Sequence, residues 1–148
     1  MSIRFEERLE MPRAAAECFA FIDDFANTPR WNTRCVDIRQ TSPGAREVGS
    51  TLHYRYKEPR REGEMSGVVT GYERDKLLEM KFSDPMLDVL VGFRFVAAAA
   101  GSVIEHWIEI TPKTFMMKVM TPLIRSATRE QLAGELAAIQ RLLPAGAP

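Results

Sequence analysis

The sequence predicts an α+β fold: a curved antiparallel sheet of about seven strands wraps around a long C-terminal helix, and two short helices follow the first strand. Three observations lead to this prediction. The chain opens with a strand pattern and a helix signal that ends at Trp31, about seven segments alternate between apolar and polar residues, and one long amphipathic segment closes the sequence. Short connections between successive strands favour antiparallel pairing, because a parallel crossover needs a much longer connection.

The first strand is predicted at residues 3–11, where apolar and charged side chains alternate, as in a strand with one face in water. Pro12 suits the first turn of a helix, because the N–H that proline lacks has no partner there, and apolar residues recur at helical spacing up to Ile22. A second short helical turn is expected from Thr28 to Trp31. Trp31 is large enough to close one end of a core.

Six more strands are predicted after Trp31, where the apolar period returns to two. They cover residues 36–38, 52–57, 62–72, 78–82, 89–95 and 104–110, and turn-forming residues at 42–44, 83–85 and 101 separate several of them. From 115 to 143 the apolar spacing becomes helical, and a helix of that length spans roughly 40 Å. Pro122 interrupts it, which predicts either a kink or a new helical segment with Thr121 as N-cap and Pro122 at the first position.

The composition indicates one globular domain over residues 1–148, with 45% hydrophobic and 27% charged residues. The 20 basic and 20 acidic residues are interspersed, so no basic stripe points to nucleic acid. No apolar segment is long enough to cross a membrane, and charged residues stand where a secretory signal needs an apolar run. Cys18 and Cys35 form no CxxC motif and are expected as reduced thiols. A cytoplasmic location is therefore expected.

The order of these elements and a set of structural residues resemble the helix-grip fold of the START-like (SRPBCC) superfamily, most closely its polyketide cyclase/dehydrase branch. The residues that carry the resemblance are Pro12, Phe19, Phe21, Asp24, Asn27, Trp31, Pro43, Gly44, Val48, Gly49, Thr51, Val69 and Tyr72. The resemblance implies a cavity between the sheet and the C-terminal helix. It leads us to expect binding of a hydrophobic or aromatic small molecule by a carrier or sensor, or alternatively a polyketide cyclase or dehydratase acting in the same cavity.

The inward face of the predicted sheet and helix is rich in aromatic residues and methionine, which suits an apolar ligand. The predicted ligand-binding residues are Phe5, Tyr54, Tyr56, Met80, Phe82, Phe93, Phe95, Ile108, Met116, Met120 and Ile124. The alternative is that these side chains simply fill a core, as apolar stripes usually do.

Two polar residues, Glu7 and His106, interrupt the apolar inward face. Burying a carboxylate or an imidazole is costly unless the group is hydrogen-bonded or serves a ligand, so we predict them as a catalytic acid/base pair. The alternative is that Glu7 reaches water while His106 bonds a tyrosine hydroxyl or a backbone carbonyl.

No metal site or cofactor is predicted. The two histidines lie on different predicted strands, and no glycine-rich loop precedes a helix. The edge strands of such a sheet allow a homodimer, although nothing in the composition requires one.

Overall fold

The computed structural model describes residues 2–59 and 61–143. Its elements are β1 (Ile3–Met11), α1 (Ala15–Asp23), η1 (Phe25–Asn27), α2 (Thr28–Trp31), β2 (Cys35–Gln40), β3 (Thr51–Glu58), β4 (Arg61–Glu73), β5 (Leu77–Ser83), β6 (Leu87–Ala98), β7 (Gly101–Pro112), α3 (Phe115–Val119) and α4 (Thr121–Leu142). The seven strands form one antiparallel sheet in the order β1-β7-β6-β5-β4-β3-β2. The predicted helix-grip fold is confirmed.

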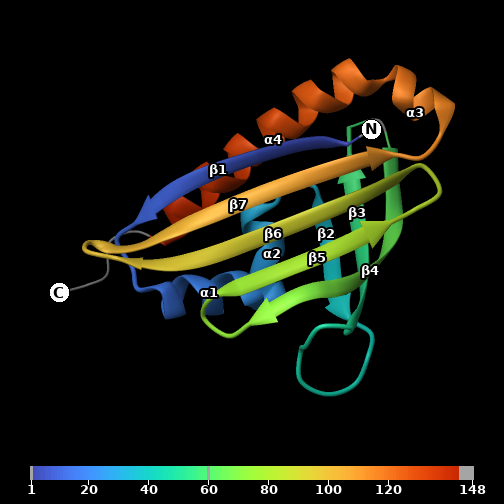
Figure 1. Cartoon of the computed structure of the whole chain (residues 1–148). Helices are drawn as coiled ribbons and strands as arrows, with labels where there is room; N and C mark the ends of the chain where they lie inside the picture. The colour runs from blue at the N-terminus through green and yellow to red at the C-terminus, as the bar shows by residue number, and fades with distance from the viewer. Residues whose placement is uncertain (1, 60, 144–148) are drawn as a thin grey trace.

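The sheet is strongly curved. Figure 1 shows β3 running almost across the direction of β6 and β7, β4 bending from the direction of β3 to that of β5, and α4 lying along β1. The strand register shifts between Cys35 and Asp37 in β2 and between Val69 and Gly71 in β4. Such irregularities bend a strand and increase its local twist. The two shifts therefore account for part of the curvature that brings β3 and β4 around toward the helices.

The helices α1 and α2 cover one end of the sheet. Phe19 of α1 packs edge-on against Phe95 with ring centroids 5.5 Å apart, and Trp31 of α2 packs edge-on against Phe93 at 5.4 Å. Trp31 is only 4% exposed. It closes this end of the core, as its size led us to expect.

The C-terminal helical region is divided into α3 and α4. Met120 lies between them with ψ of 4°, outside the helical range, and α4 then runs for 22 residues. The second of the two alternatives at Pro122 is therefore confirmed, but the expected cap is wrong by one residue. Met120 is the N-cap and Pro122 is the second helical residue, since α4 begins at Thr121, whose hydroxyl donates backwards to the carbonyl oxygen of Lys118 at 2.6 Å. No helix of the described residues is long and apolar enough to span a bilayer.

Gly92 of β6 contacts a different aromatic side chain on each face of the sheet, Trp107 on the outer face and His106 on the inner face. A Cβ atom at this position would lie 2.0 Å from Cε2 of Trp107, so only glycine leaves room for the indole ring on the outer face. The indole N–H donates to Glu79 at 3.0 Å, which fixes the ring in place. On the inner face the carbonyl oxygen of Gly92 accepts a hydrogen bond from Nδ1 of His106 at 2.8 Å.

Candidate ligand cavity

A cavity of about 320 Å³ lies between the curved sheet and the α3–α4 region, within the size range of small-molecule sites. Most of its wall is apolar. The apolar lining residues are Trp31, Ile38, Met65, Met80, Phe82, Leu87, Val89, Val91, Ile108, Ile110, Met117, Met120, Leu123, Ile124 and Ala127. The β-strands supply the floor, and the two helices supply the opposite wall.

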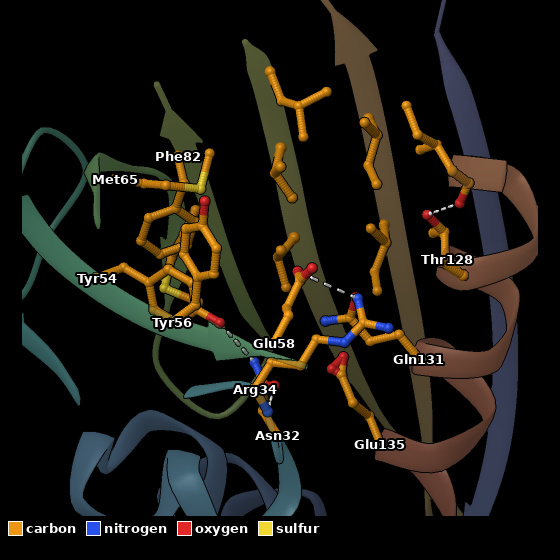
Figure 2. Close-up of a pocket in the computed structure, with 18 of the residues that line it drawn as sticks. Asn32, Arg34, Tyr54, Tyr56, Glu58, Met65, Phe82, Thr128, Gln131 and Glu135 are labelled. Atoms are coloured by element: carbon orange, nitrogen blue, oxygen red, sulfur yellow. Dashed lines mark hydrogen bonds and ion pairs between the residues drawn. The ribbon is translucent and has the colours of Figure 1, made fainter. Parts of the chain in front are cut away.

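One end of the cavity is polar, and Figure 2 shows its side chains converging from the loop after α2, from β3 and from α4. Arg34 connects these elements. Its Nη1 donates to Oε1 of Gln131 at 2.9 Å and lies 3.8 Å from a carboxylate oxygen of Glu58. The loop after α2, the end of β3 and the middle of α4 are therefore linked by one guanidinium group.

Two tyrosines bring hydroxyl groups into this end. Tyr54 and Tyr56 have ring centroids 6.0 Å apart in a stacked arrangement, and Asn32 donates to the hydroxyl of Tyr54 at 3.4 Å. Burial raises the pKa of Tyr54 far above its ordinary value, so this hydroxyl keeps its proton at neutral pH. Arg61 donates to the hydroxyl of Tyr56, with its guanidinium carbon 5.1 Å from the ring centroid.

Three buried polar atoms of the wall have no hydrogen-bond partner within the described part of the chain, namely Nε of Arg61 and two atoms of α2. The two atoms of α2 are the hydroxyl oxygen of Thr28 and the indole nitrogen of Trp31. A buried polar atom without a partner costs free energy, on the order of 1–3 kcal/mol. All three residues line the cavity, so oxygen atoms of a bound molecule are suitable partners.

Glu135 and His106 form a buried contact behind the polar end. Nε2 of His106 lies 3.5 Å from Oε1 of Glu135, and the imidazole stacks on Phe93 with ring centroids 4.0 Å apart. Because a carbonyl oxygen only accepts, the Nδ1 bonded to Gly92 carries the hydrogen, and Nε2 faces the carboxylate. Glu135 is 4% exposed and lines the cavity, whereas His106 is fully buried and lies behind it.

The structure separates the two residues predicted as an acid/base pair. Glu7 lies directly opposite His106 in the pairing of β1 with β7, a register that the sequence alone did not predict. However, Glu7 is exposed and does not line the cavity, and the carboxylate next to His106 is that of Glu135. His106 bonds a backbone carbonyl, which is one of the two alternatives expected for it.

Seven of the eleven predicted ligand-binding residues line the cavity, namely Tyr54, Tyr56, Met80, Phe82, Ile108, Met120 and Ile124. The other four lie elsewhere. Phe93 and Phe95 pack beneath Trp31 and Phe19, because α1 and α2 fill that end of the sheet. Phe5 contacts Arg129 at the edge of a second core cluster, and Met116 is 71% exposed on α3.

Sequence reasoning missed the charged and amide side chains of the cavity. Arg34 lies in a short loop and Glu58 at a strand end, where a charged side chain normally indicates only solvent. Glu135 carried a usable signal. It stands three residues after Leu132 and four before Ile139, so it shares the buried face of α4.

Comparison with known proteins supports the same fold. No curated protein matches the chain significantly in sequence. Among solved structures, the Zhui aromatase/cyclase from a Streptomyces species is 7% identical with a TM-score of 0.80, and the match covers 100% of both chains. A START superfamily protein from Mycobacterium smegmatis is 13% identical with a TM-score of 0.78, covering 95% of this chain and 96% of that chain.

A polyketide-cyclase-like protein from Corynebacterium glutamicum is 22% identical with a TM-score of 0.64, covering 97% of this chain and 92% of that chain. At these identities the likeness concerns the fold alone. The family is shown by the sequence itself, because residues 2–143 match the family described as polyketide cyclase / dehydrase and lipid transport. The chain belongs to this family.

Proposed function

We propose that the protein binds a hydrophobic, largely aromatic small molecule with a polar end, and acts as its carrier or sensor. The observation that carries the proposal is the cavity of about 320 Å³, whose wall is apolar except at one end. Protein interiors are normally packed with few voids larger than a water molecule. A void of this size loses packing contacts along its whole wall, and a bound molecule would restore them.

The wall suggests how such a molecule is oriented. Its apolar part would lie against Met65, Phe82 and Met120, because methionine side chains adapt to irregular shapes and aromatic rings pack on flat ones. Its oxygen atoms would point to the polar end, where the indole N–H of Trp31 lacks a partner and the Arg34 guanidinium is already oriented by Gln131.

Native mass spectrometry of the freshly purified protein, followed by denaturation, tests this function first. We expect a discrete adduct that is released on denaturation.

We also expect saturable binding of the fluorescent probe anilinonaphthalene sulfonate (ANS), an aromatic anion. At a probe concentration one hundred times Kd, binding stabilises the protein by about 2.7 kcal/mol. In a domain of this size, that raises Tm by roughly 5–10 °C. The absence of an adduct, together with no saturable ANS fluorescence and no change in Tm, would contradict the proposal.

A cyclase or dehydratase is the second candidate, favoured by the nearly buried carboxylate of Glu135 in the cavity wall beside His106. In an aldol-type ring closure, a carboxylate removes a proton from the carbon between two carbonyl groups, and the enolate then attacks a further carbonyl carbon. The carboxylic acid so formed returns the proton to the new alkoxide. In the following dehydration, the carboxylate removes a second proton from the same carbon and then donates it to the departing hydroxyl group, which leaves as water. Both steps need the carboxyl group about 3 Å from the reacting proton.

This candidate predicts that Glu135→Gln lowers turnover of a poly-β-ketone thioester analogue by roughly 100- to 10,000-fold, because a general acid/base typically contributes that much. ANS affinity should change little, since the amide keeps the shape of the side chain. Product formation is measured by mass spectrometry. Unchanged turnover in Glu135→Gln would remove the assignment. A similar loss of turnover in Glu7→Gln would instead support a catalytic role for Glu7 and His106, the acid/base pair predicted from the sequence.

A further inference from the structure

A patch of exposed apolar side chains lies on α3 and the first turn of α4. Its members, here called the α3–α4 patch, are Phe115 (82% exposed), Met116 (71%), Val119 (61%), Met120 (37%) and Leu123 (63%). Single exposed apolar residues are ordinary on a protein surface, but a contiguous group usually marks an interaction site. Among the described residues, the other large exposed apolar side chains are those of Val36 in β2, Val48 in the loop before β3 and Val96 in β6.

The chain segment that contains the α3–α4 patch carries charges of one sign only. Between residues 110 and 129 the chain carries four basic residues and no acidic one, although the whole protein has 20 of each sign. The basic residues are Lys113, Lys118, Arg125 and Arg129. Lys113 lies 3.5 Å from Asp88. Lys118 and Arg125 are exposed and form no ion pair within residues 2–59 and 61–143.

The patch is also continuous with the cavity. Met120 and Leu123 line the cavity and are at the same time exposed on the outer surface. The cavity therefore opens beside the patch, between α3 and the start of α4. Figure 1 shows this region at the end of the molecule farthest from the turn between β4 and β5.

We propose that the α3–α4 patch docks the protein on the surface of an anionic lipid bilayer. Helical segments that lie in a membrane interface combine basic residues with aromatic and aliphatic side chains. Here Phe115, Met116 and Val119 supply the inserted apolar surface, while Lys118 and Arg125 face the lipid phosphates. Docking in this orientation places the mouth of the cavity against the bilayer, so that an apolar molecule can pass between them without crossing water.

The proposal is tested by co-sedimentation of the whole protein, without added ligand, with two kinds of vesicle. One kind contains phosphatidylcholine and phosphatidylglycerol, and the other contains phosphatidylcholine alone. We expect binding to the anionic vesicles, much weaker binding to the neutral ones, and loss of binding as the salt concentration rises. Because no ligand is added, the result does not depend on the function proposed above.

Two sets of variants connect binding to the patch. The double variant Phe115→Asp, Val119→Asp removes apolar surface without touching the cavity wall, and Val48→Asp is its control, since Val48 is also 61% exposed. The charge variant Lys118→Glu, Arg125→Glu should weaken binding at least twentyfold, because each basic residue near an anionic surface contributes roughly fivefold. Its control is Arg74→Glu, in the turn between β4 and β5.

The two controls should bind like the unmodified protein, and circular dichroism should show that every variant is folded. If the unmodified protein does not bind anionic vesicles, the proposal is overturned and the patch serves a different partner, such as a protein with an acidic surface. Equal binding by the patch variants and their controls overturns it as well.

Discussion

Replacing Val91 with tryptophan should abolish ANS binding while leaving the protein folded. Val91 lies in the middle of β6, opposite Met80 on one neighbouring strand and Ile108 on the other, and all three side chains line the cavity. The side chain is only partly buried, because it faces open volume. An indole at this position therefore extends into the cavity and occupies the space of a ligand. We expect the Kd measured by fluorescence titration to rise at least tenfold.

The matched control is Val96→Trp on the same strand. Val96 is 42% exposed and does not line the cavity, so this variant makes the same valine-to-tryptophan substitution outside the cavity. This variant should bind ANS with the affinity of the unmodified protein. Met80→Trp offers a second way to fill the cavity. If both filled variants still bind ANS normally, the binding site lies elsewhere on the protein.

Replacing His106 with leucine should lower the free energy of unfolding by about 3–5 kcal/mol, because two buried polar groups lose their hydrogen-bond partner at a cost of roughly 1–3 kcal/mol each. The change leaves Glu135 buried without its partner, and it removes the hydrogen bond to the carbonyl of Gly92. For a chain of this length the corresponding fall in Tm is roughly 10 °C. Thermal and urea unfolding followed by circular dichroism measure the effect.

The other histidine supplies the control. His53 is partly exposed and lies 3.6 Å from an exposed carboxylate oxygen of Glu64, so His53→Leu should change stability by about 0.5 kcal/mol or less. The double variant His106→Leu, Glu135→Leu should recover part of the stability lost in the single variant, because no carboxylate remains unpaired. Glu135→Leu alone completes the comparison. If the double variant loses as much stability as the two single variants lose in sum, the contact between His106 and Glu135 does not contribute to stability.

The sequence was sufficient for the fold because each strand alternates and each helix has its own start signal. Alternation predicted that Glu7 and His106 point to the inner side of the sheet, although not that their strands pair, and Pro122 correctly marked a division of the C-terminal helical region. Alternation gives the face of a residue but not its position along a curved sheet. Phe93 and Phe95 are therefore on the predicted face, yet α1 and α2 cover that end and leave the cavity near Tyr54 and Phe82.

The cavity wall was harder to predict for two physical reasons. The break before α4 turns Met116 outward, whereas an unbroken helix would have kept it above the sheet. The polar end is assembled from a loop, a strand end and a helix, so no local pattern in the sequence predicts it. Arg34 and Gln131 are 97 residues apart in the sequence and meet only because the sheet closes on α4.

The two tryptophans of this chain lie on opposite sides of the sheet. Trp31 contributes to the cavity wall, whereas the ring of Trp107 covers Gly92 on the outer face, with its N–H bonded to Glu79. An occupant of the cavity changes the polarity and the quenching around the first indole and leaves the second in a constant environment. The protein thus carries an intrinsic optical reporter of its own occupancy, together with a built-in reference signal.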